Sequence, residues 1–140
     1  MIRSWQDIPG WFDFQDIYDQ AVSEAEDGDT LVEVGSFLGK SAAYMAERIQ
    51  ASGKLLRQIS VDPWSDTDYA NWWINCNTPY PSPTPGDDLI GKSLWDGFNY
   101  ATLQAGVWNR IHAMRMKSHV AAPLITDASL FFVFIDADHR

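Results

Sequence analysis

The sequence predicts an α/β fold in which parallel strands alternate with helices. Stretches with helical periodicity and short apolar stretches follow one another along the 140-residue chain. A glycine-bearing turn follows the first strand in "TLVEVGSFLGKS", residues 30–41, and Leu130–Ile135 is an unbroken apolar run of the kind found in a central strand covered on both faces. Such alternation favours a parallel sheet with right-handed crossovers. The length fits one domain, residues 1–140.

Composition narrows the class of protein. The chain is 46% hydrophobic and carries a formal net charge of -9, so it should fold, and neither a nucleic acid nor an anionic membrane is an expected partner. The single cysteine, Cys76, excludes an internal disulfide. The N-terminus does not resemble a signal peptide, and no apolar run reaches membrane-spanning length. We expect a soluble cytoplasmic protein.

The first predicted helix is amphipathic. It lies in "DFQDIYDQAVSEAEDGD", where Asp13 is a candidate N-cap and Gly28 a candidate stop. Apolar residues at helical spacing form its inward face: Phe14, Ile17, Tyr18, Ala21, Val22 and Ala25.

The next elements set up the first half of the sheet. They are a strand at Leu31–Val34, a glycine turn at 35–39, a helix to about Ile49, and a second strand at Leu55–Asp62. The residues that follow are rich in tryptophan and proline, and residues 77–87 form a Pro-rich loop because proline forbids a regular element there. Trp64 and its neighbouring tryptophans are expected in packing or, alternatively, in stacking on a substrate.

The last third of the chain supplies the remaining strands. We expect a helix over Asp87–Gln104, a strand within 109–118, a helical turn around Val120–Ala122, and a strand at Leu130–Ile135. No chain is left to pair with the far edge of that last strand. A long apolar edge invites association, so we expect a homodimer or a complementing partner chain.

The acid in the first strand indicates a ligand site. Glu33 lies within an apolar strand, where a buried charge is costly. Ligands of open α/β sheets bind beyond the carboxyl ends of the strands, and Asp62 follows Gly39 at roughly the 20-residue offset at which an acid binds a ribose diol. The glycine spacing is not G-x-G-x-x-G, and a pyrophosphate would be repelled by Glu33. A positively charged nucleoside such as S-adenosylmethionine suits these residues better.

Four motifs occur in an order that resembles a known family. "VEVGSFLGKSAAYMA", "SVDPW", "KSHVAA" and "FVFIDADH" are similar to class I S-adenosylmethionine-dependent methyltransferases, in the group related to catechol and macrolide-sugar O-methyltransferases. The resemblance implies a Rossmann-like parallel sheet with strand order 3-2-1-4. It also implies that the chain lacks the C-terminal strands of the full fold and much of the acceptor pocket.

The resemblance implies a set of cofactor contacts near the ends of the strands. Ser41 would bind the methionine carboxylate, Asp62 the ribose, and Asp136 the amino group of the cofactor. Ser118 and His119 would meet the adenine edge. The full implied set is Glu33, Gly35, Ser36, Phe37, Gly39, Ser41, Asp62, Trp64, Ser118, His119 and Asp136.

The resemblance also implies where chemistry would take place. Asp136 and His139 match residues with catalytic roles, and in metal-dependent relatives the counterpart of Asp136 binds a divalent cation such as Mg²⁺. The alternative for this cluster is a solvated chain terminus without a ligand. Alternatives for the other residues are a Glu33 held by backbone amides, an Asp62 that only ends a strand, and a His119 on the surface.

These observations leave three hypotheses about function. The leading hypothesis is methyl transfer from S-adenosylmethionine to an oxygen of a small molecule such as a sugar or polyol. The first alternative is a non-catalytic or partner-complemented module that binds S-adenosylmethionine. The second is a nicotinamide-dependent oxidoreductase, which has the right sheet but the wrong glycine spacing.

Overall fold

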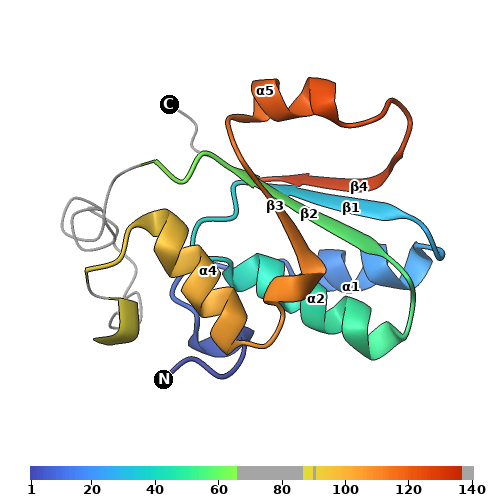
Figure 1. Ribbon diagram of the computed structural model, residues 1–140. Helices are drawn as coiled ribbons and strands as arrows, with labels where there is room; N and C mark the ends of the chain where they lie inside the picture. The colour runs from blue at the N-terminus through green and yellow to red at the C-terminus, as the bar shows by residue number, and fades with distance from the viewer. Residues whose placement is uncertain (66–86, 90, 137–140) are drawn as a thin grey trace.

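The computed structural model describes residues 1–65, 87–89 and 91–136 of the chain. Its strands form one parallel sheet in the order β3-β2-β1-β4, as the sequence predicts (Figure 1). The strands are β1 (Thr30–Val34), β2 (Arg57–Asp62), β3 (Ile111–Arg115) and β4 (Leu130–Ile135). Because all pairings are parallel, the carboxyl ends of the described strands lie at one edge, and the strand order reverses between β1 and β4.

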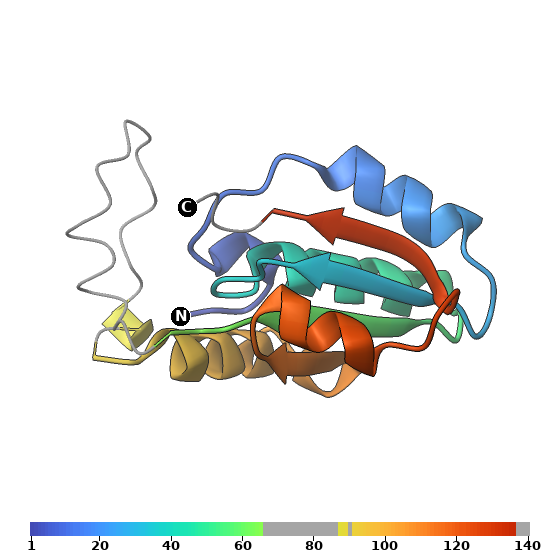
Figure 2. The same cartoon turned by 90° about the horizontal axis from the view of Figure 1, so that it is seen from above.

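Helices cover the two faces of the sheet unequally. Helices α1, α2 and α4 lie on one face and α5 lies on the other (Figures 1 and 2). Their bounds are α1 (Gln15–Glu24), α2 (Lys40–Ser52), α4 (Leu94–Gln104) and α5 (Ser118–Ala121). Short 3-10 turns join them: η1 (Trp5–Asp7), η2 (Asp87–Leu89), η3 (Trp108–Arg110) and η4 (Ala122–Leu124).

Several predicted boundaries were wrong. Phe14, not Asp13, precedes α1, which ends at Glu24 before Gly28 is reached. The helix predicted over Asp87–Gln104 is two separate elements, η2 and α4. The hydroxyl of Ser93 accepts a hydrogen bond from the backbone N–H of Asp96 at 3.0 Å, so α4 has a true N-cap and begins after it.

Register assigns each residue of β1 to a face. Leu31 and Glu33 of β1 pair with Phe132 and Phe134 of β4, and these side chains point toward the α1 and α2 layer. On the other face Val32 packs with the α5 layer. Glu33 therefore lies on the more heavily covered face, between β2 and β4.

The main core fills the space between the sheet and the three helices. One part surrounds Tyr18 of α1, Leu31 of β1 and Met45 of α2, all fully buried. A second part joins Leu38 to Phe98 of α4 and to Trp64. This second part packs the β1–α2 turn against α4.

Strand β4 differs from the prediction of a strand covered on both faces. Its residues alternate between half-buried and exposed positions, and Val133 and Ile135 are 46% and 70% exposed. Phe132 and Phe134 on the opposite face contact Tyr18. The unbroken apolar run therefore has only one covered face within the described residues.

The predicted Pro-rich loop at 77–87 lies almost entirely outside the described residues, as do Trp72, Trp73, Asp138 and His139. No helix within the described ranges is long and apolar enough to cross a membrane.

Candidate functional site

The glycine turn between β1 and α2 has a backbone that ordinary residues rarely adopt. Gly35 and Gly39 have φ values of 90° and 89°, and Phe37 between them has a φ of 48°. Positive φ costs glycine little, because it has no Cβ. The N–H of Gly35 donates to the carbonyl of Val61 at 2.8 Å, which ties the turn to β2. The sequence "GSFLG" therefore folds as a compact turn at the carboxyl edge.

Gly39 is needed for space as well as for conformation. A Cβ on this residue would lie 2.9 Å from Cγ2 of Thr102 and 3.0 Å from the ring of Phe98. Both neighbours are side chains of α4, so the backbone of the turn packs directly against side chains of that helix. This contact fixes the start of α2 relative to α4.

Glu33 is the most unusual residue of the site. It is 1% exposed, and its Oε2 accepts a hydrogen bond from the hydroxyl of Tyr18 at 2.5 Å. Its Oε1 has no hydrogen-bond partner among the described residues. Burial raises the pKa of Glu33, although the hydroxyls of Tyr18, Ser41 and Ser36 oppose this shift. Oε1 of Glu33 can therefore accept a hydrogen bond from a ligand.

Two serine hydroxyls near Glu33 are also buried without a described partner. Ser36 lies in the turn, and Ser60 of β2 is the register partner of Glu33 across the strands. Ser36 is close enough to lower the pKa of Glu33, yet it makes no hydrogen bond of normal geometry. The site therefore holds several buried polar groups without a hydrogen-bond partner in the described part of the chain, and such groups are rare.

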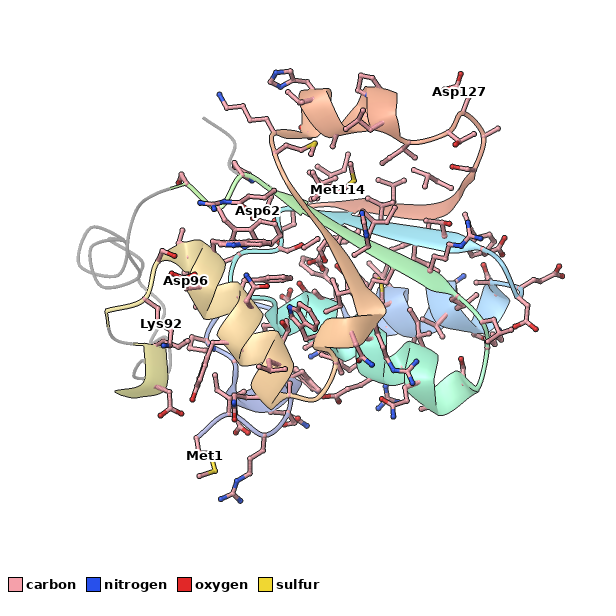
Figure 3. All side chains as sticks on the ribbon, in the orientation of Figure 1. Met1, Asp62, Lys92, Asp96, Met114 and Asp127 are labelled. Atoms are coloured by element: carbon pink, nitrogen blue, oxygen red, sulfur yellow. The ribbon has the colours of Figure 1, made fainter. Side chains whose placement is uncertain are left out.

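Asp62 holds the turn in place. Its Oδ2 accepts from the N–H of Phe37 at 3.0 Å, and its Oδ1 accepts from the N–H of Trp64 at 2.8 Å. The residue lies at the carboxyl end of β2 (Figure 3). Each carboxylate oxygen still has capacity for another donor, so this structural role leaves room for ribose hydroxyls.

Asp136 reaches the same edge from β4. Its N–H donates to the carbonyl of Val34 at 2.9 Å, and its charge contributes to the raised pKa values of Glu33 and Tyr18. Glu33, Asp62 and Asp136 therefore lie at or next to the carboxyl ends of β1, β2 and β4. A concentration of carboxylates at one edge favours a cationic ligand.

The residues predicted to meet the adenine lie in different surroundings. The side chain of Trp64 is 1% exposed, packs against Trp95 and Phe98, and donates from Nε1 to the carbonyl of Phe37 at 2.6 Å. Ser118 and His119 are exposed at the start of α5, just beyond β3. The cofactor contacts of these residues stay predictions.

The predicted catalytic pair is only partly visible. Asp136 is exposed at the edge of the sheet, and His139 lies outside the described residues. Within 1–65, 87–89 and 91–136, no group of three His, Cys, Asp or Glu side chains is placed to hold a metal ion.

Sequence reasoning missed Tyr18 as a residue of the site. The helical pattern assigns it only to the apolar face of α1, yet its hydroxyl contacts Glu33. The available signal was a tyrosine on a buried helix face beside a strand that contains an acid, since a buried phenol needs a partner.

A cleft of about 830 Å³ lies at the opposite end of the sheet from these carboxylates. Arg57, Arg110 and His112 line it together with Thr126 and Ser129. Figure 3 shows Asp127, of the loop beside this cleft, well away from Asp62. The cleft therefore belongs to a different region from the site at Glu33.

Comparison with protein families identifies the domain. The sequence model of a family described as "Methyltransferase domain" matches residues 32–140. The chain belongs to this family. The matched residues of this methyltransferase domain include Glu33, the glycine turn and Asp62, whereas Tyr18 and the rest of α1 precede them. No curated protein matches the chain.

One solved structure shares the fold of this domain. The cofactor-bound Rv0187 from MTB aligns over 94% of this chain with a TM-score of 0.55 and 16% identity. The chain spans 47% of that protein's length. A cyclopropane-fatty-acyl-phospholipid synthase-like protein from Lactobacillus casei aligns over 88% of this chain and 40% of its own length. The sequence identity is 16% and the TM-score is 0.40. The last score is too low to carry an argument about fold.

The residues of the domain fit the cofactor that its family implies. S-adenosylmethionine carries an ammonium group and a sulfonium. Oε1 of Glu33, which has no partner among the residues that the structure describes, is a buried acceptor that suits such a cation. Asp62 has acceptor capacity left for hydroxyl groups, and Gly35 and Gly39 allow close approach of backbone. Glu33, Asp62 and Asp136 would hold the cofactor.

Proposed function

We propose that this domain binds S-adenosylmethionine at the carboxyl edge of the sheet and transfers its methyl group to a small molecule. The observation that carries the proposal is the buried carboxyl of Glu33 beside the glycine turn, with one oxygen unpartnered among the described residues. Unpaired burial of a carboxyl is costly, so the arrangement makes physical sense when a cationic donor completes it.

Electrostatics supports S-adenosylmethionine over other nucleotides. Glu33, Asp62 and Asp136 place carboxylates at the same edge, and the chain carries a net charge of -9. A pyrophosphate such as that of NAD would be repelled there, whereas a sulfonium with an ammonium group would be attracted. The nicotinamide-dependent alternative is therefore disfavoured.

Methyl transfer depends more on positioning the acceptor than on activating the methyl donor. The methyl group leaves an already activated sulfonium and passes to the lone pair of an acceptor oxygen, while the acceptor's proton goes to a base. We propose Asp136 and His139 for this base. The acceptor class is an oxygen of a sugar or polyol, in keeping with the resemblance to catechol and macrolide-sugar O-methyltransferases. A divalent cation, with Asp136 as one ligand, would lower the pKa of the acceptor hydroxyl.

Isothermal titration calorimetry tests the cofactor part of the proposal. We expect binding of S-adenosylmethionine and of its demethylated product S-adenosylhomocysteine, and no comparable binding of NAD. Glu33→Ala should strongly weaken the binding of S-adenosylmethionine. A wild-type protein that binds neither nucleoside, or that prefers NAD, would refute the proposal.

Turnover distinguishes an enzyme from a binding module. Wild-type protein is incubated with labelled S-adenosylmethionine and a panel of sugars and polyols, with and without Mg²⁺ and with EDTA. Transfer of label to an acceptor supports the enzyme. Binding without transfer favours a cofactor-binding module.

A further inference from the structure

We propose that Tyr18 is a positioning residue that orients the carboxyl of Glu33 toward the amino group of S-adenosylmethionine. The inference rests on the proposed function and adds a residue outside the matched part of the chain. Tyr18 would not touch the cofactor. It would act by fixing one oxygen of Glu33, so that the other is presented to the ligand.

The contact between the two side chains is short and fully enclosed. The hydroxyl of Tyr18 lies 2.5 Å from Oε2 of Glu33, and the two residues are 0% and 1% exposed. Burial and the nearby carboxyl raise the pKa of Tyr18, so the phenol stays protonated and donates. Hydrogen bonds from O–H to a carboxylate are short and strong in this way.

Aromatic neighbours hold the ring of Tyr18 in place. Phe132 and Phe134 of β4 lie edge-on to it with ring centroids at 5.9 and 5.2 Å, and Phe12 lies at 5.2 Å. A ring packed on several sides cannot swing its hydroxyl away without disturbing β4. Tyr18 therefore links α1 and β4 to one atom of Glu33.

This restraint leaves the second oxygen of Glu33 in a defined place. Oε1 has no partner among the described residues, while Asp136, Ser36 of the turn and Ser41 of α2 lie close enough to influence the carboxyl. Without the Tyr18 donor, the carboxyl would be free to rotate and to seek other hydroxyls. Preorganised acceptors bind a cation more tightly, because less is spent on ordering them.

Tyr18 lies outside the part of the chain that the family model matches. The family match begins at residue 32, and Tyr18 lies on the helix that precedes it. The donor to Glu33 is thus supplied from outside the matched residues.

A double-mutant cycle tests the proposal. The dissociation constant of S-adenosylmethionine is measured by calorimetry for wild type, Tyr18→Phe, Glu33→Gln and the double variant. We expect Tyr18→Phe to weaken binding about tenfold, the scale of one charge-assisted hydrogen bond. We expect the double variant to bind within about twofold of Glu33→Gln, since the two residues act together.

Two controls separate positioning from a general loss of structure. Tyr44→Phe removes a different tyrosine–carboxylate contact, the 2.8 Å hydrogen bond from Tyr44 of α2 to Asp19 of α1, without touching Glu33. This variant should bind like wild type. Methylthioadenosine, which lacks the amino-acid part of the cofactor, should bind wild type and Tyr18→Phe equally.

The outcomes are distinct. A wild type that does not bind S-adenosylmethionine refutes the proposed function itself. Unchanged binding by Tyr18→Phe, losses that add in the double variant, or an equal loss of methylthioadenosine overturns the role of Tyr18 while the proposed function stands. If Tyr18→Phe does not fold, proton NMR of wild type replaces it. A downfield hydroxyl resonance should persist in the cofactor complex and vanish in Glu33→Gln; its disappearance in the complex overturns the role.

Discussion

Replacing Gly39 with alanine should damage the fold through two separable effects. The residue has a φ of 89°, and an L-residue in this left-handed region costs about 1–2 kcal/mol. The new Cβ would also meet Thr102 at 2.9 Å and the Phe98 ring at 3.0 Å. Forcing a methyl group into a packed region costs about 1–3 kcal/mol. The expected loss of unfolding free energy is therefore about 2–5 kcal/mol.

Gly53→Ala is the matched control, because it changes the other end of the same helix. Gly53 has a φ of 71° and nothing within 4 Å of its added Cβ, so it should lose only the conformational part, about 1–2 kcal/mol. Urea denaturation of both variants and wild type, monitored by circular dichroism, measures the difference. Equal losses for the two variants would refute the inference that α4 packs against the turn.

The Gly39 contact should also matter for the cofactor. An alanine there moves α4 or the start of α2, and either shift displaces the turn that carries Ser36 and Phe37. We expect Gly39→Ala to weaken binding of S-adenosylmethionine, whereas Gly53→Ala should leave it unchanged. Wild-type affinity in a folded Gly39→Ala protein would show that the turn does not contact the ligand.

Three further predictions follow from buried or exposed groups. Burial raises the pKa of Glu33 above its ordinary value of 4.5, so the folded state binds the carboxyl proton more tightly than the unfolded state does. Ionisation of Glu33 therefore lowers the stability of the protein as pH rises from 4.5 through the raised pKa. Glu33→Gln should therefore gain stability relative to wild type over that range in urea melts; a pH-independent difference would contradict this. Lys40→Met removes hydrogen bonds from Nζ to the carbonyls of Gln6 and Ile8 at 3.1 and 3.0 Å, and should cost about 1–2 kcal/mol and speed amide exchange in the N-terminal segment. Light scattering should show a dimer that Ile135→Lys disrupts, since this side chain is 70% exposed on edge strand β4; a monodisperse wild-type monomer at high concentration would count against it.

The sheet was predictable because its signals are local. The apolar run Leu130–Ile135 matches β4 residue for residue, and the alternation of helices and strands specifies parallel pairing. Boundaries were harder where a cap decides them. Ser93 and Gly91, whose φ is 79°, separate α4 from η2, although the apolar pattern runs through both.

Only those residues of the site that are unusual within their own stretch of sequence could be predicted. Glu33 stands out because a charge within an apolar strand is unusual. Its partner Tyr18 belongs to an ordinary amphipathic pattern, and no local rule joins residues on a helix and a strand. Trp64 gives the opposite case: it sits beside Asp62 in a motif, yet a φ of 39° turns its indole into the core.

Helix α1 has a practical consequence for anyone shortening this protein. Lys54 donates from Nζ to the carbonyls of Val22, Ser23 and Ala25 at 2.7–2.8 Å, a cationic clamp on the end of the helix. A fragment trimmed to the matched residues 32–140 would lose these hydrogen bonds and would expose the apolar side chains around Met45. It would also leave Glu33 of β1 without the hydroxyl of Tyr18. The boundary by which relatives are recognised is thus not the boundary at which this molecule can be cut.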